Sequence, residues 1–186
     1  MPKSTIRAVL VGLAMLAAPV AQAAPLDGLT LSADYRFPDL GTVYPAATAT
    51  GPFVVGTGPA PVIEVEGVTT ISLDFLGNSL TVLLNTVLAS PTWNDTAFNG
   101  LRIALGSPGS FTGFGATGAT AGAVTTSFTP DALLIDWGGL SYADGTSLTF
   151  DIAYAAPAAV PLPAGLPLLA LALGGLAVLG RRRRAA

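Results

Sequence analysis

The chain has 186 residues, of which 51% are hydrophobic and 10% charged, and it contains neither cysteine nor histidine. Disulfides, thiolate chemistry and sites built on histidine are therefore excluded. The formal charge of −3 is unevenly distributed: all eleven acidic residues lie between Asp27 and Asp151, where Arg36 and Arg102 are the only basic residues. This part carries a net charge of −9, which repels polyanions, so we expect no binding to nucleic acid.

Residues 1–23 have the three parts of a secretory signal peptide. A positively charged start, an apolar stretch and small residues before a cleavage site are supplied by Lys3 and Arg7, residues 8–20, and Ala21 and Ala23. The apolar stretch has thirteen residues. A membrane span needs about 20, which favours a cleaved signal over a permanent anchor. We expect signal peptidase to cut after Ala23 and the following residues to be exported.

Four segments of the middle region alternate apolar and polar side chains with a period of two, which indicates strands with one buried face. In chain order they are residues 29–37, 71–75, 101–105 and 148–154. Segments 79–88 and 132–137 are more continuously apolar, which suits central strands.

Turn residues agree with this pattern, since Gly77-Asn78 predicts a turn between two strands and Asp144-Gly145 a tight hairpin. We expect residues 24–156 to form a single antiparallel β-sandwich, jelly-roll or immunoglobulin-like, of about seven to ten strands.

Two segments, 43–61 and 106–122, are poor in large side chains and rich in Gly, Ala, Thr and Pro, so we expect long exposed loops there. The second segment contains Gly113, Gly115 and Gly118 at the spacing of the dinucleotide-binding fingerprint. That fingerprint requires a strand before it and a helix after it. Small and β-branched residues follow instead, which favours a loop.

The end of the chain predicts a membrane segment. Residues 157–164 form a proline-rich linker, residues 165–180 carry no charge, and a basic tail of residues 181–186 follows. A helix from residue 164 to 180 would rise about 25 Å, slightly less than the ~30 Å hydrocarbon core. Arginines resist translocation, so the tail is expected to stay in the cytoplasm while the middle domain faces out.

The linker ends in the motif Val160-Pro161-Leu162-Pro163-Ala164, and the tail begins with Arg181-Arg182-Arg183-Arg184. This motif, one short apolar helix and a terminal arginine cluster resemble the PEP-CTERM type of sorting tail in its VPLPA variant. The resemblance implies cleavage in or near the motif by an exosortase-type membrane peptidase, in a Gram-negative bacterium that makes extracellular polysaccharide. It implies an inner-membrane precursor with a periplasmic domain, delivered to the cell surface or beyond. A permanent membrane anchor with no peptidase is the rival interpretation.

Carboxylates are the available acid–base groups. Glu64 and Glu66 lie two residues apart, so on a strand they would share a face about 7 Å apart, a spacing that could suit glycoside hydrolysis. The alternative is a solvated outer face with Ile63 and Val65 directed inward, which we favour. Asp95, with Asn94 and Asn99, has oxygens that could bind calcium, but such clusters usually form turns.

Trp93 is the candidate glycan contact, because it follows Pro91 in a predicted loop and aromatic faces stack on sugar rings. Trp137 follows an apolar run and is expected in the core.

We therefore expect a non-enzymatic exported surface or matrix protein with a structural or adhesive role, and neither a metal nor a cofactor. The alternatives are a carbohydrate-binding module for extracellular polysaccharide, a permanently anchored β domain, and a hydrolase using Glu64 and Glu66.

Overall fold

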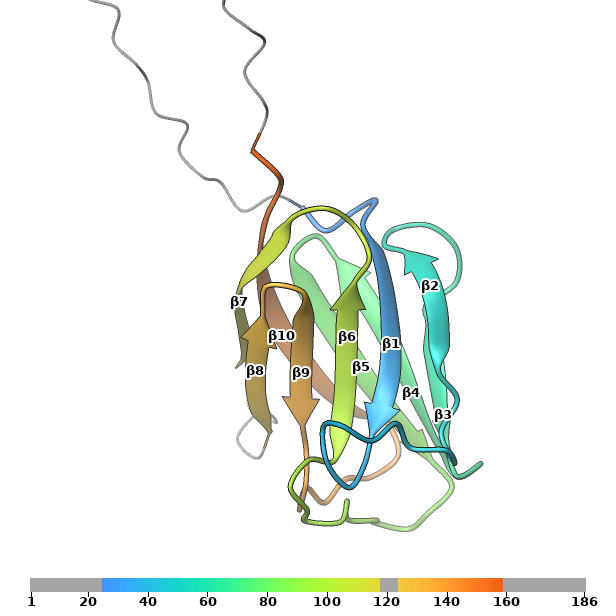
Figure 1. The fold of residues 1–186 in the computed structure, drawn as a ribbon. Helices are drawn as coiled ribbons and strands as arrows, with labels where there is room; N and C mark the ends of the chain where they lie inside the picture. The colour runs from blue at the N-terminus through green and yellow to red at the C-terminus, as the bar shows by residue number, and fades with distance from the viewer. Residues whose placement is uncertain (1–24, 118–123, 159–186) are drawn as a thin grey trace, which may run out of the picture.

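The structure, a computed structural model, describes residues 25–117 and 124–158. These residues form ten strands and no helix, and the strands lie in two antiparallel sheets packed face to face (Figure 1). The predicted all-β sandwich is confirmed at this level. The expected signal peptide, VPLPA motif, apolar helix and arginine tail lie outside the described residues. Within the described ranges, no helix is long and apolar enough to span a membrane.

Each sheet has five strands. Sheet A consists, in spatial order, of β2 (Thr50–Val54), β1 (Thr30–Arg36), β6 (Gly100–Leu105), β9 (Ala132–Asp136) and β8 (Thr125–Thr129). Sheet B consists of β3 (Val62–Val65), β4 (Thr69–Leu76), β5 (Ser79–Thr86), β10 (Thr146–Ala155) and β7 (Ser110–Thr117).

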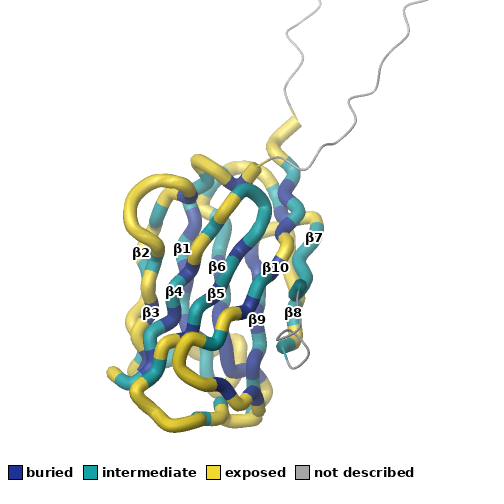
Figure 2. Tube along the Cα trace, turned by 180° about the vertical axis from the view of Figure 1, so that it is seen from behind, coloured by how far each residue is buried: buried dark blue, intermediate teal, exposed yellow. Residues whose placement is uncertain are grey.

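The core lies between the sheets and is built by the alternation seen in the sequence. On β1, Leu31, Ala33 and Tyr35 are buried and the residues between them are partly exposed. The same pattern recurs along β10, and Figure 2 shows buried residues alternating along the strands while the loops are exposed. Because successive side chains of a strand point to opposite faces, each strand contributes every second residue to the core. The predicted strands at 71–75 and 101–105 are confirmed as β4 and β6.

The two continuously apolar segments form interior strands, as predicted. β5 lies in the middle of sheet B, and β9 lies between β6 and β8 in sheet A. Gly77-Asn78 forms the predicted turn between β4 and β5, and Gly77 has a φ of 60°, a left-handed conformation that glycine adopts without steric cost.

Both predicted long loops contain a strand, so that expectation is wrong in part. Segment 43–61 includes β2, and segment 106–122 includes β7. β7 pairs with β10, and its two large side chains pack against rings of that strand: Phe114 stacks on Phe150 at 5.4 Å, and the ring of Phe111 lies 6.3 Å from that of Tyr154. Gly113 and Gly115 are therefore residues of an extended strand rather than of the turn that the dinucleotide fingerprint requires.

The predicted hairpin at Asp144-Gly145 is also wrong. The turn exists, with a φ of 79° at Gly145, but it ends the crossing from β9 in sheet A to β10 in sheet B. It therefore connects strands that do not pair with each other.

The sandwich has two distinct ends. β1, β3, β5 and β9 all run toward one end, and the connections that follow them lie there; we call this end the distal pole (Figure 1). The described chain begins before β1 and ends after β10, and both places lie at the opposite end (Figure 1). The distal pole is thus the part of the domain farthest from both of its chain ends.

A substitution at Gly100, the first residue of β6, tests how closely β6 packs against β9. A Cβ on Gly100 would lie 1.8 Å from the carbonyl oxygen of Ile135, so the backbone would have to shift. We expect Gly100→Ala to lower the free energy of unfolding by about 3 kcal/mol or more, measured by urea denaturation. Gly51→Ala in β2 is the control, because a Cβ there meets no atom within 4 Å. Equal stability of the two variants would contradict this packing.

Candidate functional site

A cavity of about 180 Å³ opens at the distal pole, and we call it the distal-pole pocket. Five of the residues that line it are aromatic: Tyr35, Phe37, Tyr44, Trp93 and Tyr142. Its polar lining includes Glu66, Thr69, Thr92, Asn94 and Asn99. Concave sites with aromatic walls and a few polar groups are typical of small-ligand sites, so this pocket is the candidate functional site.

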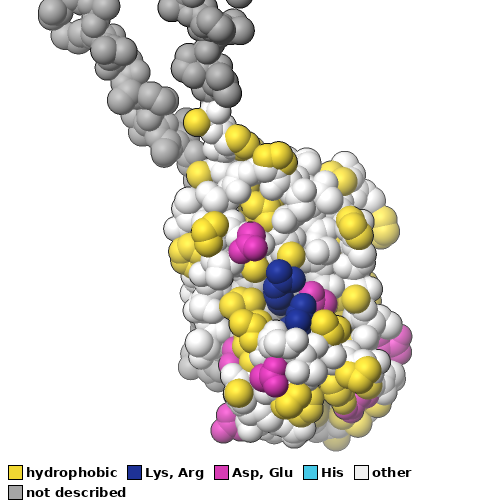
Figure 3. Space-filling model, viewed as in Figure 1, with side chains coloured by type: hydrophobic (Ala, Val, Ile, Leu, Met, Phe, Trp, Pro, Cys, Tyr) yellow, Lys and Arg dark blue, Asp and Glu magenta, His cyan; other side chains and the backbone are white. Residues whose placement is uncertain are grey.

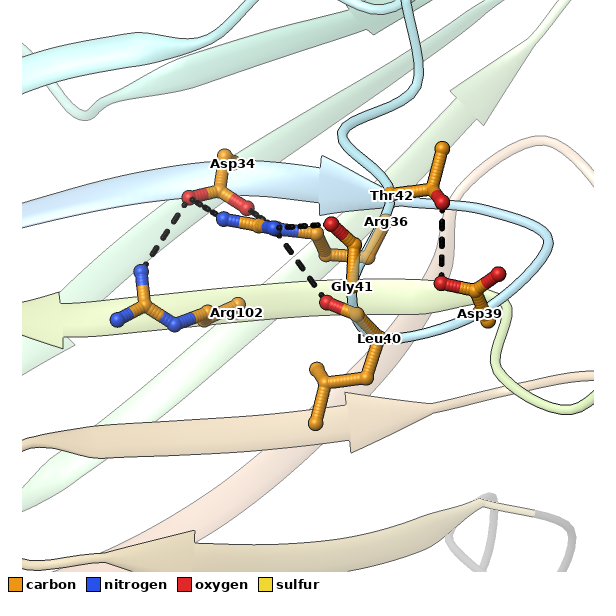
Figure 4. A network of polar contacts seen from close by, with 7 residues as sticks. All are labelled: Asp34, Arg36, Asp39, Leu40, Gly41, Thr42 and Arg102. Atoms are coloured by element: carbon orange, nitrogen blue, oxygen red, sulfur yellow. Dashed lines mark hydrogen bonds and ion pairs between the residues drawn. The ribbon is translucent and has the colours of Figure 1, made fainter.

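The loop after β1 brings Tyr44 back beside Tyr35. The amide of Phe37 donates to the carbonyl of Thr42 at 3.1 Å, and the amide of Tyr44 donates to the carbonyl of Tyr35 at 2.9 Å. Arg36 spans the same loop, since its Nη1 lies 3.4 Å from the carbonyl oxygens of Leu40 and Gly41 (Figure 4). These bonds fix the position of the Tyr44 ring at the pocket.

Arg36 and Arg102 both bind Asp34 on the outer face of sheet A. Arg36 forms a two-point contact with this carboxylate, and Arg102 Nη1 lies 3.5 Å from Asp34 Oδ2 (Figure 4). The space-filling view shows the two basic side chains close together in the middle of this face (Figure 3). The basic groups of the described domain are thus both engaged away from the pocket.

Glu66 reaches the pocket because the chain turns sharply after β3. The strand ends at Val65, and Glu66 has a φ of 54°, in the left-handed region that non-glycine residues rarely adopt. Its amide donates to the carbonyl of Ala46 at 2.8 Å, which ties it to the segment after Tyr44. The Tyr44 hydroxyl donates to the Glu66 carboxylate, and this hydrogen bond is the main cause that raises the pKa of Tyr44.

Glu64 and Glu66 do not lie on one strand, as the less favoured hydrolase hypothesis required. Glu64 lies on β3 with its side chain exposed, whereas Glu66 lies beyond the strand and lines the pocket. Ile63 and Val65 are buried, at 0% and 3% exposure, as the alternative interpretation predicted.

A buried chain of hydrogen bonds lies beneath the pocket. Trp137 Nε1 donates to the Tyr35 hydroxyl at 3.0 Å, and that hydroxyl donates to Asn99 Oδ1 at 2.5 Å. Asn99 Nδ2 in turn donates to the carbonyl of Asn94 at 2.8 Å. Burial raises the pKa of Tyr35, so its hydroxyl stays protonated and can donate.

Trp93 lines the pocket as a half-buried ring rather than as an exposed loop residue. Its ring lies 4.8 Å from that of Tyr142 with an angle of 9° between the planes, and 5.7 Å from that of Trp137. Its backbone bonds to Leu140 and Gly139 hold it in this stack. Its buried indole N–H has no hydrogen-bond partner in the described protein. Trp137 is fully buried, as predicted.

Asn99, one of the three candidate calcium ligands, has no free side-chain atom to offer a metal. Asn99 is 3% exposed, and both ends of its side-chain amide are used in the buried hydrogen-bond chain. Asn94 and Asp95 are exposed. Among the described residues, no group of three or more acidic side chains is close enough together to hold a metal ion.

No protein family, curated protein or solved structure matches this chain. Function is therefore inferred from the sequence and from the pocket. Sequence reasoning identified Trp93 as a candidate contact but missed Tyr44 and Glu66 as partners, because they lie 22 positions apart and meet only through the fold.

Tyr35→Phe tests the buried hydrogen bonds. The variant leaves the Trp137 N–H and Asn99 Oδ1 without their partner, and each unpaired buried group costs about 1–3 kcal/mol. We expect a loss of about 2–4 kcal/mol in the free energy of unfolding at pH 7, measured by urea denaturation. Tyr44→Phe is the control, because its hydroxyl bonds an exposed carboxylate and should cost about 1 kcal/mol or less.

The raised pKa of Tyr35 also predicts a pH dependence. Unfolded tyrosine titrates near pH 10, whereas buried Tyr35 stays protonated to higher pH. Its contribution to stability is present below pH ~10 and is lost as the pH rises above it. The fall in stability between about pH 10 and 11 should therefore be shallower in Tyr35→Phe than in the parent chain. Parallel curves would contradict a tyrosine held protonated by the fold.

Proposed function

We propose that the chain is an exported, non-enzymatic surface or extracellular-matrix protein of a Gram-negative bacterium, with a structural or adhesive β-sandwich domain. The observation that carries the proposal is the order of three features at the end of the chain: the motif Val160–Ala164, the uncharged residues 165–180, and the arginines 181–184. The predicted signal peptide at residues 1–23 supports the same route.

The described domain is compatible with such delivery. Its two chain ends lie at the same end of the sandwich, so a tether through the tail would leave the distal pole directed away from the membrane (Figure 1). The net charge of −9 between Asp27 and Asp151 keeps the surface hydrated and repels polyanions. We retain the jelly-roll or immunoglobulin-like assignment as part of this proposal.

The masses of the protein in membrane and extracellular fractions test the sorting route. We expect an extracellular species that begins at Ala24 and ends within Val160–Ala164. Pro161→Ala combined with Pro163→Ala should retain the precursor in membranes, whereas Pro157→Ala, outside the motif, should not. A chain that ends at Ala186 and is found solely in membranes would instead support the permanent anchor.

Carbohydrate binding is the second candidate function. The observation that favours it is the position of Trp93 in an aromatic pocket at the distal pole, beside Asn94 and Glu66. We expect binding to extracellular polysaccharide on a glycan panel to be lost in Trp93→Ala and kept in part in Trp93→Phe, with near-UV circular dichroism as the folding control. Absence of binding to every glycan would refute this candidate and leave the sorting proposal intact.

A further inference from the structure

The distal-pole pocket has aromatic walls of several orientations. The ring of Tyr44 lies 6.1 Å from that of Tyr35 at an interplanar angle of 51°, and 5.2 Å from that of Phe37 at 72°. Steeply inclined rings around one space form a concave aromatic surface. Such surfaces attract cations through the negative faces of the rings, and aromatic cages recognise quaternary ammonium groups in this way.

Glu66 gives the pocket a negative charge that no basic side chain neutralises. It is the one charged residue among the described residues that line the pocket. Arg36 and Arg102 are both paired with Asp34 on sheet A. The carboxylate accepts one hydrogen bond from Tyr44, and an ionised carboxylate has about four acceptor sites, so it can take a further donor or an adjacent cation.

The net negative charge of the whole domain also favours a cationic ligand. The region from Asp27 to Asp151 has a net charge of −9, which raises the local concentration of cations and repels anions. Phosphates and carboxylates are thus disfavoured at this pocket.

The size and stacking of the pocket favour a compact head group over a stacked sugar. About 180 Å³ is close to the ~150 Å³ of a cavity that holds one benzene-sized molecule. Tyr142 already lies flat against Trp93 at 4.8 Å, which covers ring surface that a pyranose would need. A small cation also needs access to a ring face, but to a smaller area of it than a stacked pyranose does.

We infer that the distal-pole pocket binds an organic ammonium group, with Glu66 as its counter-ion and Phe37, Tyr44 and Trp93 as its aromatic walls, above the buried ring of Tyr35. Both alkylated amines and amino sugars carry this chemistry. The inference does not depend on the sorting route, and it differs from general glycan binding because it requires a positive charge on the ligand.

The test is a fluorescence titration of the purified full-length chain in a neutral, sugar-free detergent. Trp93 and Trp137 are its two tryptophans and both lie in the aromatic cluster, so ligand binding should change their emission. We expect choline to bind at least about tenfold more tightly than its uncharged isostere 3,3-dimethylbutan-1-ol, and the affinity to fall as salt is added. Equal affinities, or no binding of any ammonium compound, would overturn the inference.

A second pair of ligands identifies the source of the ammonium group. Glucosamine should bind more tightly than glucose, because the two sugars differ in the charged amino group. Tighter binding of glucosamine than of choline would indicate an amino-sugar polymer, and the reverse would indicate an alkylated amine. Equal binding of glucose and glucosamine would count against a charge-dependent site.

Two matched variants test whether the negative charge that attracts the ligand is that of Glu66. Glu66→Gln should weaken choline binding about tenfold, whereas Glu64→Gln, which removes the same charge outside the pocket, should leave it unchanged. If the two variants weaken binding equally, the attraction is general and the proposed site is wrong. Tyr44→Leu removes one wall and keeps Glu66, so it should also weaken binding, with near-UV circular dichroism as the check on folding.

Discussion

The buried hydrogen bonds from Trp137 through Tyr35 to Asn99 organise the distal pole. They join the end of β1, the segment after β9 and the residue before β6, which are far apart in the sequence. A buried polar group is costly unless it is paired, so these three side chains specify one arrangement of the loops around them. Asp136 extends the constraint, since its Oδ1 accepts from the amides of Asn99 and Gly138, both at 3.0 Å. The aromatic pocket is the surface that this arrangement exposes.

Much of the fold could be predicted because strand alternation is a local property of the sequence. The buried side chains of β1, β4, β6 and β10 follow it directly. β2 and β7 could not be predicted, because each is an edge strand with few large side chains of its own and depends on the neighbouring strand for its packing. The hairpin predicted at Asp144-Gly145 is wrong because turn residues indicate the local backbone conformation. They do not indicate whether the strands on either side pair with each other.

The pocket was harder to predict, because it consists of contacts between distant segments. Tyr44 meets Glu66 because the residues after Tyr44 bond the outer edge of β3: Thr48 N donates to the carbonyl of Glu64 at 2.9 Å. No local pattern encodes that pairing. Trp93 stands out in the sequence as a loop aromatic, but its burial is set by backbone bonds to the segment after β9. Sequence pattern could therefore identify one pocket residue and not the cage around it.

The placement of β10 has a mechanical consequence. β10 is the last strand of the described chain, and it is hydrogen-bonded on both sides, to β5 and to β7. A pull on the chain beyond Ala155 therefore acts along the strand and loads both ladders in shear, so many hydrogen bonds must break together. Had the chain left from an edge strand at a right angle, the bonds would open one at a time. A domain held from this end under fluid drag would resist extraction of its own anchoring strand.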